Sequence, residues 1–323
     1  MEDGESSSED SSDNSLNNLY LRKASSEDVD KIIKIYNKSR DYLDEEDEEW
    51  IRSIVSSRSR RIKAYVLKEN EVKAFAIVYK KNDVAYIDAL AVDPEYRGRG
   101  LGTLFLRSLE LMLRKEGFKK ILLTVKHHNL KALSLYLKHG YKIRNIVLVL
   151  EVSDQEKIRS IYSSNVNKDV RYKIYTYSRK YLRKKMLETA VWSVYTGDVD
   201  ELIYMKSREN RIILTAYEGK ILIGMAVISL DKDILEVERL ALSYHETIES
   251  LMTIMRGIYD LSEILSKKDY RILIPVDASK NLILNTLMIL GFRVVDSEYV
   301  LTKDLSENLL SIKILQQIYL KHK

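Results

Sequence analysis

An internal repeat is the feature that most constrains how this chain of 323 residues can fold. Residues 61–92 can be laid over residues 211–242 with a constant shift of 150 and no gap, and farther along the shift becomes 151. The longer shift places Gly140 on Gly291 and Tyr141 on Phe292. A repeat of this period predicts two copies of one fold in tandem, each long enough to enclose its own core. Two unrelated α/β domains are the alternative.

We expect the first domain to span residues 19–152 and the second residues 153–323. Residues 1–18 contain six acidic residues, no Lys or Arg and almost nothing apolar to bury, so we expect a disordered tail. The whole chain is 45% apolar and 31% charged with a net charge of +5, which indicates a globular protein. No apolar run approaches the roughly 18–20 residues that span a bilayer, so we expect no membrane contact and a cytoplasmic location. The absence of Cys excludes disulfides and cysteine-based metal sites.

Helix and strand patterns alternate from Leu19 onward. Runs rich in Val, Ile, Tyr and Ala predict strands, and apolar residues at helical spacing predict helices. Together they predict a mixed α/β sheet, mostly antiparallel, flanked by helices. In the first domain the expected strands are residues 19–23, 62–68, 72–79, 84–92, 119–125 and 141–150, and the expected helices follow Ser26 and cover residues 47–56, 101–115 and 129–139.

The densest chemical signal is the segment from Ala89 to Thr103, which passes from a strand through a glycine-rich turn into a helix. Glycines remove the side chains that would keep a phosphate away, and a helix N-terminus directs about half a positive charge at the same place. The segment therefore predicts a pyrophosphate-binding loop, to which Arg97 and Arg99 add positive charge. It lacks Gly-Lys-Ser/Thr, so an ATP-type P-loop is not supported. A tight turn whose glycines serve only packing is the alternative.

Two motifs resemble those of the GNAT superfamily of acyl-CoA-dependent N-acyltransferases, and the resemblance covers about residues 19–152. The family pattern Arg/Gln-x-x-Gly-x-Gly/Ala is met by Arg97, Gly100 and Gly102. A second family segment follows at the family's spacing, and it is met by Asn129, Ala132, Leu135, Tyr136, Gly140 and Tyr141.

The resemblance implies an N-acetyltransferase with acetyl-CoA as co-substrate, an amine acceptor and no metal. It implies that the backbone of Leu90, Ala91 and Val92 pairs with the pantetheine arm like an added strand. Asn129 would contact the pantetheine or thioester region, and Tyr136 would be the general acid that protonates the departing thiolate. The turn that would hold the pyrophosphate consists of Arg97, Gly98, Arg99, Gly100, Leu101, Gly102 and Thr103.

The general base is an open question. Many relatives that acetylate protein amines place Glu or His where this chain has Thr124, which cannot act as a base at neutral pH. Tyr86 matches a position where relatives carry Glu or Tyr, and it could order a water that takes the proton. His127 and His128 are further candidates, although surface or packing roles are commoner for such residues. A protein α-amino group needs a base less than lysine does, because its pKa lies near neutrality.

Other amines, including lysine and polyamines, stay open as acceptors. The acidic run of residues 44–49 could line an acceptor groove and attract a cationic amine, or it could be a solvated loop and helix start.

The second copy lacks these motifs, so we expect it to be degenerate. Where the first copy has its glycines, it has the run from Ser243 to Thr247; Leu287 replaces Tyr136, and Glu236 takes the place of Tyr86. The basic, tyrosine-rich stretch of residues 157–185 could bind nucleic acid, but solvated helix surfaces are the favoured interpretation. A non-catalytic CoA-sensing or nucleic-acid-associated protein is therefore the alternative function. Residues 305–320 predict an amphipathic helix.

Overall fold

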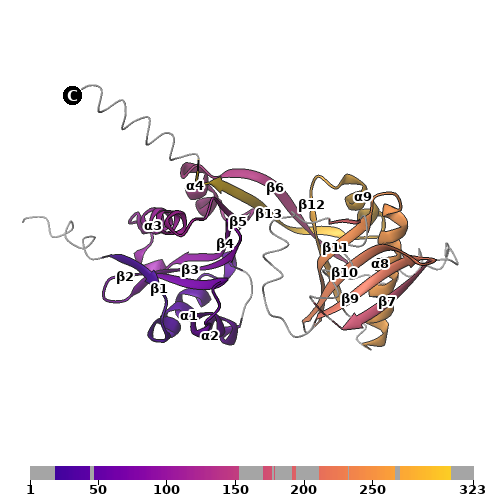
Figure 1. Cartoon of the computed structure of the whole chain (residues 1–323), viewed down its shortest axis with the longest axis horizontal. Helices are drawn as coiled ribbons and strands as arrows, with labels where there is room; N and C mark the ends of the chain where they lie inside the picture. Colours follow the sequence, from indigo (N-terminus) through magenta and orange to yellow (C-terminus); the bar gives the residue numbers. More distant parts are fainter. Residues whose placement is uncertain are drawn as a thin grey trace, which may run out of the picture. The chain divides into compact units, whose positions relative to one another are not determined.

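The computed structural model describes residues 19–43, 47–152, 170–176, 178, 191–193, 211–231, 233–265 and 270–306. Contacts divide the chain into two compact units, Met1–Ile121 with Asp304–Lys323, and Leu122–Lys303 (Figure 1). The predicted acidic tail, most of the basic stretch of residues 157–185 and the predicted C-terminal helix beyond Ser306 lie outside the described residues. No helix in the described ranges combines the length and the apolar character needed to cross a membrane.

The first unit is an antiparallel sheet with helices on both faces. Its strands follow the order β1 (Tyr20–Lys23), β2 (Ile62–Lys68), β3 (Val72–Lys81) and β4 (Val84–Val92). Helices α1 (Val29–Asn37) and α2 (Glu48–Ser56) cover one face and α3 (Leu101–Lys115) the other (Figure 1). The strands are rich in β-branched and aromatic residues, which suit a pleated surface buried on both faces.

The core of the first unit forms where these helices meet the sheet. On α1, Ile32 and Tyr36 are almost fully buried, and the Tyr36 ring stacks on Phe75 of β3 with centroids 6.0 Å apart. On α3, Phe105 and Leu109 are fully buried. The apolar stripes that predicted these helices therefore face the sheet.

The second unit is a larger mixed sheet with the strand order β5-β13-β6-β12-β11-β10-β9-β7. Its pairs are antiparallel except for the parallel pair of β11 with β12, among the pairs whose direction the structure gives. Helix α8 packs against β7, β9, β10 and β11 over a core that includes Leu214, Ile254 and Ile258. The bounds are β5 (Lys120–Lys126), α4 (Leu130–Lys138), β6 (Lys142–Val152), β7 (Val170–Thr176), β8 (Val191–Ser193), β9 (Arg211–Glu218), β10 (Ile221–Asp231), β11 (Ile234–Ser243), α8 (Thr247–Ile264), β12 (Arg271–Asp277), α9 (Asn281–Ile289) and β13 (Arg293–Asp304).

The mixed α/β fold predicted from the sequence is confirmed, and the ends of the expected elements either match or differ by one or two residues. The repeat is visible even in the irregularities of the sheet. A bulge makes Asp88 the extra residue of β4 opposite β3, and the same bulge makes Glu238 the extra residue of β11 opposite β10, 150 residues later. A second bulge, at Lys73 of β3, recurs at Ile223 of β10. Bulges are specific features of a fold, so two matched bulges indicate two copies of one architecture.

The last strands of the two copies are exchanged, which the sequence did not predict. Strand β13 lies between β5 and β6, and β6 lies between β13 and β12. Val147 pairs with Glu298, its own equivalent 151 residues later, so this pair marks a local two-fold relation. Two backbone hydrogen bonds obey the same relation: His127 N–H donates to the Ser297 carbonyl at 2.9 Å, and Ala278 N–H donates to the Ile146 carbonyl at 2.8 Å. The domain boundary near Val152 stays a prediction, since the exchange makes the division by contacts fall elsewhere.

Candidate functional site

The glycine-rich turn of the first unit connects β4 to α3 through a short helical turn at Pro94–Tyr96. Gly98 has φ +79° and Gly100, the residue that precedes α3, has φ +76°. A side chain at either position would meet no atom within 4 Å, so glycine is needed for the backbone conformation and not for space. The left-handed conformation costs about 1–2 kcal/mol for other residues. The loop is exposed, and buried Leu101 anchors it to the core.

The start of α3 supplies hydrogen-bond donors to this loop. Leu104 N–H donates to the Gly100 carbonyl at 3.0 Å and begins the helical ladder. The N–H groups of Leu101, Gly102 and Thr103 have no acceptor within the helix, because the first turn of any helix lacks one. These donors and the helix dipole fit an anion such as a diphosphate. The Arg99 side chain is exposed beside them.

Arg97 braces the loop through two hydrogen bonds. Its Nε donates to the Val92 carbonyl at 2.9 Å and its Nη2 donates to Ser39 Oγ at 2.8 Å. This guanidinium therefore ties the turn to β4 and to the segment after α1. From the sequence, Arg97 is expected to place a positive charge near the pyrophosphate. Its bracing role and its partner Ser39 were not predicted.

Asp93 is a buried carboxylate beneath the loop, with none of its side chain exposed. Its oxygens lie 3.0 Å from Lys31 Nζ and 3.5 Å from Lys38 Nζ, and it accepts the N–H of Glu95 at 3.3 Å. Burial alone would raise the pKa of Asp93, but the hydrogen bond from Lys31 and the other partners lower it. Burial likewise opposes the charge of Lys31, yet hydrogen bonds to Glu71 and Asp93 raise its pKa to about 12. An Asp directly before a proline is a typical cap, and this signal could have identified Asp93 from the sequence.

The end of β4 offers the backbone expected for the pantetheine arm. Along one edge, Leu90, Ala91 and Val92 pair with Ala76, Phe75 and Ala74 of β3. The resemblance assigns pantetheine to the opposite edge of this strand.

The second family motif lies in the second unit. Asn129 caps α4, since its Oδ1 accepts the N–H of Ala132 at 3.1 Å, and this fixes the start of the helix that carries Tyr136. Tyr136 is 6% exposed, and its ring meets Tyr141 edge-on with centroids 5.3 Å apart. Burial raises the pKa of Tyr136. The phenol is therefore protonated at neutral pH, as a general acid must be.

The candidates for a base occupy different surroundings. Tyr86 is 4% exposed in the first unit and its ring lies 6.4 Å from that of Tyr79, its cross-strand neighbour. Thr124 lies half-buried on β5 in the second unit, and His127 and His128 are exposed in the turn after it.

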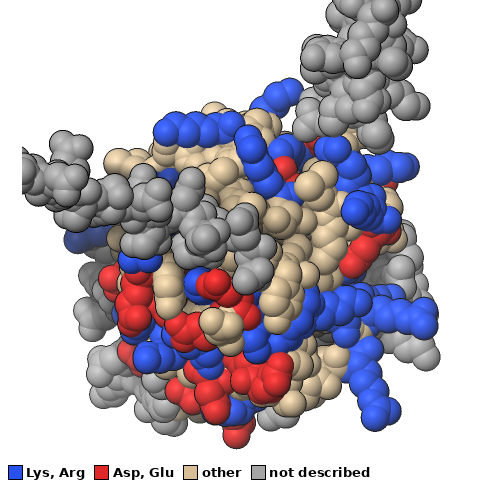
Figure 2. Space-filling view, turned by 90° about the vertical axis from the view of Figure 1, so that its left-hand side faces the viewer, with Lys and Arg blue, Asp and Glu red and all other residues tan. Residues whose placement is uncertain are grey.

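The first unit also carries a surface groove between α1 and α2 of about 530 Å³. Acidic Asp30 and Glu48 and basic Lys34 and Arg52 all contribute to its lining. Arg52 Nη2 lies 3.0 Å from Asp30 Oδ1. Acidic and basic side chains mingle on this side of the unit, in the lower part of Figure 2. Of the acidic run, residues 44–46 lie outside the described residues, and Asp47 is an N-cap that accepts the N–H of Trp50 at 2.6 Å.

The corresponding turn of the second copy already uses its donors. Ser243 Oγ accepts the N–H groups of His245 and Glu246, each at 3.3 Å, and Thr247 Oγ1 donates to the Ser243 carbonyl at 2.8 Å. None of the residues from Ser243 to Thr247 is a glycine. This turn therefore lacks glycines, and its own Ser243 side chain takes up two N–H groups that precede α8.

A strand of the chain itself lies along the second copy's equivalent of the pantetheine edge. Strands β11 and β12 pair only from Ile234 to Glu236 on β11, and beyond this point they diverge. Strand β8 then pairs with Ala241, Leu242 and Ser243, on the edge of β11 opposite β10. Ala241 and Leu242 correspond, at the shift of 150, to Ala91 and Val92. The backbone groups that would face pantetheine are thus occupied.

Comparison with known proteins places the first loop within a region that matches a protein-family model. Residues 28–141 match the model of the acetyltransferase (GNAT) family. The match covers a GNAT domain within the chain and not the chain as a whole. The chain is 33% identical over 91 residues to the ribosomal protein bS18-alanine N-acetyltransferase of Escherichia coli K12, which covers 28% of this chain and 62% of that enzyme. It is 39% identical over 70 residues to acetyltransferase SG1711 of Sodalis glossinidius, which covers 21% of this chain and 49% of the relative. The chain thus spans about half to three fifths of the length of these relatives.

Solved structures extend the GNAT fold to both copies. A tandem GNAT protein from the clavulanic acid biosynthesis pathway matches 89% of this chain and 98% of its own, with a TM-score of 0.66 and 10% identity. A GCN5-related N-acetyltransferase from Sphaerobacter thermophilus matches 90% of this chain and 96% of its own, with a TM-score of 0.58 and 15% identity. At these identities the likeness concerns the fold, and it confirms the tandem GNAT architecture.

Proposed function

We propose that the first GNAT copy transfers an acetyl group from acetyl-CoA to an amine, with the α-amino group of a protein N-terminus as the favoured acceptor. The observation that carries this proposal is the turn from Arg97 to Thr103. Two left-handed glycines and the open first turn of α3 form an anion cradle there, directly after the strand edge expected to pair with pantetheine. These residues fit a molecule with a diphosphate next to an extended, amide-bearing arm.

The chemistry requires little beyond positioning and one proton donor. Acetyl-CoA supplies the acetyl group as a thioester. The neutral amine attacks the carbonyl carbon, the C–N bond forms as the C–S bond breaks, and the amine nitrogen loses one proton to water. Tyr136 donates its phenolic proton to the departing sulfur and later recovers one from solvent. Holding two reactants together can supply much of the rate acceleration.

The acceptor class follows from the lack of a strong base at Thr124. An α-amino group has a reference pKa of about 7.7–8.0, so a useful fraction is neutral at physiological pH, whereas lysine at about 10.4 is almost fully charged. A water ordered by Tyr86 is then sufficient to take the proton. The activity of the Escherichia coli relative toward a ribosomal-protein alanine supports the same acceptor class.

The test uses the full chain, acetyl-CoA with a labelled acetyl group, and two matched peptides. One peptide has a free α-amine and an acetylated lysine, and the other has an acetylated α-amine and a free lysine. We expect label on the first peptide only, and calorimetry should give one bound CoA per chain. Label on lysine alone would overturn the acceptor class. Absence of transfer to both peptides and to cell-extract proteins would overturn the function itself.

A further inference from the structure

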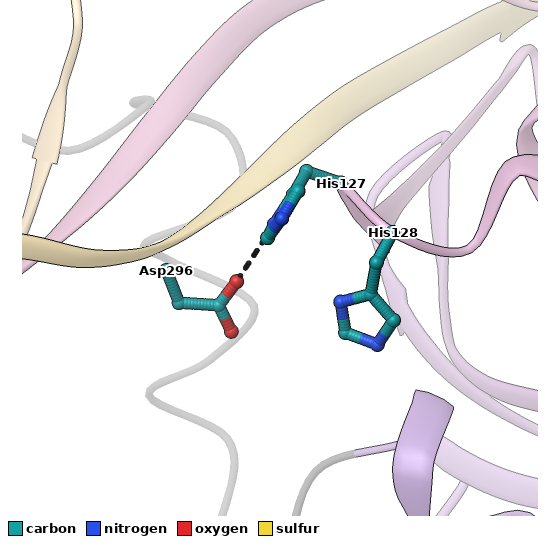
Figure 3. A group of neighbouring side chains, drawn as sticks. All are labelled: His127, His128 and Asp296. Carbon is teal, nitrogen blue, oxygen red and sulfur yellow. Dashed lines mark hydrogen bonds and ion pairs between the residues drawn. The ribbon is translucent and has the colours of Figure 1, made fainter.

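Three potential metal ligands meet at the junction of the exchanged strands (Figure 3). His127 and His128 occupy the turn between β5 and α4, and Asp296 lies on β13. His127 Nδ1 lies 3.0 Å from Asp296 Oδ1, and one ligand atom from each of the three residues lies within 4.8 Å of the others. The two imidazole rings are nearly perpendicular, at 85°, with centroids 5.2 Å apart.

The backbone holds these residues in place while leaving the cluster open to solvent. The N–H of His127 donates to the Ser297 carbonyl at 2.9 Å, which ties the turn to β13. Asp296 Oδ1 accepts the N–H of Ser297 at 2.7 Å, which orients the carboxylate. The side chains of His127 and Asp296 are 50% and 32% exposed, so an ion can enter without unfolding any element.

The repeat supplies an internal comparison. At the shift of 151, the equivalents of the two histidines are Ala278 and Ser279, and the equivalent of Asp296 is Asn145. The equivalent backbone hydrogen bond exists there, from Ala278 N–H to the Ile146 carbonyl. The fold therefore builds this junction twice, yet only one of the two junctions carries the full set of ligand types. The packing of the exchanged strands therefore does not require two histidines and an aspartate at these positions.

We propose that His127, His128 and Asp296 bind a zinc ion. Two imidazoles and one carboxylate are ligands that Zn²⁺ accepts, whereas Mg²⁺ and Ca²⁺ prefer oxygen alone. Bonds of about 2.0–2.2 Å in a tetrahedral site place ligand atoms roughly 3.4 Å apart, so a small rotation of the exposed rings closes the site. Three protein ligands leave the fourth position to water. The family resemblance implies no metal, and the sequence offers His127 and His128 only as candidate bases or as surface residues. The zinc proposal does not depend on acetyl transfer.

The bound ion would fasten the start of α4 to a strand supplied by the other copy. Asn129, the cap of α4, directly follows His128, and Tyr136 lies two turns farther along the helix. Zinc would therefore stabilise the element that carries the second family motif. We expect this as a rise in the thermal unfolding temperature of the full chain.

The experiment titrates ZnCl₂ into the chelator-treated full chain by calorimetry and repeats the thermal melt with and without zinc. We expect one strong site per chain. His128→Ala and Asp296→Asn should each weaken binding by about tenfold or more, since even outer-shell changes cost roughly 10–100-fold in metal affinity. His245→Ala, which removes an exposed histidine outside the cluster, should change neither the affinity nor the thermal shift.

Circular dichroism of the metal-free variants separates loss of a ligand from loss of folding, and Asp296→Asn preserves the size of the side chain. Co²⁺ offers a second measurement, because its visible absorption reports the ligands directly and should disappear in His128→Ala. No zinc binding to the native chain would overturn the proposal. Binding that survives both cluster substitutions would also overturn it, because other residues would then hold the ion.

Discussion

At the scale of single residues, the side chains considered for function lie in unlike environments. Tyr136 is buried and neutral, whereas Asp93 is buried and charged because two lysines reach it. Both residues lie in segments that the sequence analysis describes, but only Tyr136 belongs to a family motif. The burial of Asp93 depends on α1 folding over it. Its partners Lys31 and Lys38 lie 62 and 55 positions earlier in the chain. A local pattern cannot show such partners.

Replacing Tyr136 with Phe should remove the proton donor while the ring still packs against Tyr141. We expect kcat to fall by about 10²–10⁴-fold, the usual contribution of a general acid, with KM for acetyl-CoA nearly unchanged. Steady-state kinetics check this. Because burial raises the pKa of Tyr136, the native enzyme should not lose this acid between pH 7 and about pH 10. An equal loss of CoA binding would contradict the assigned role.

Replacing Asp93 with Asn should lower the free energy of unfolding by roughly 1–3 kcal/mol at neutral pH, because two lysines lose their buried partner. The folded-state pKa of Asp93 is lowered, so its stabilisation is complete above the ordinary value and is lost as the pH falls through the folded value. The difference between variant and native chain should therefore shrink below about pH 4. Urea unfolding at several pH values measures it. A difference that does not depend on pH would exclude the charge as its cause.

At the scale of elements, one strand–loop–helix unit is built twice with opposite outcomes. The first copy opens its backbone with glycines, and the second fills the same place with Ser243 hydrogen bonds and with β8. The missing glycines were predictable from the sequence, since residue types alone show them. The pairing of β8 was not, because three residues far from β11 along the chain carry no pattern that selects their partner.

Gly100→Val tests the loop directly. Its φ of +76° disfavours a β-branched residue, so we expect the KM for acetyl-CoA to rise roughly 5- to 30-fold through a cost of about 1–2 kcal/mol in loop geometry. Gly100→Asn should be milder, because Asn tolerates this conformation. Gly117→Val, at φ +92° beyond the end of α3, imposes similar strain away from the loop and should reduce stability without affecting the KM. Equal KM changes in all three variants would contradict a binding role for Gly100.

At the scale of the whole molecule, the sequence predicted the two copies but not the way their strands pair. Shifts of 150 and 151 follow from residue patterns that each copy needs for its own core. The exchange of β6 and β13 leaves those patterns unchanged, since either strand offers a similar face to β5 or to β12. Only the three-dimensional pairing distinguishes an exchanged strand from an unexchanged one.

A chain that ends at Val152 should therefore fail as a monomer, since it lacks β13 between β5 and β6. We expect it to be poorly soluble or to dimerise, because two β6 strands can pair about a true two-fold axis through Val147, as β6 now pairs with β13. Light scattering and thermal melts measure the outcome. A control chain that begins at Leu19 keeps every described element and should match the full chain. A stable monomeric fragment would contradict this expectation.

The exchange of final strands makes each copy depend on the other for a complete sheet. Without the second copy, the first copy would have no β13 between β5 and β6, and β6 would have no strand to pair with. The second copy, although it lacks the glycines and the tyrosine of the first, is therefore required for the fold of the first.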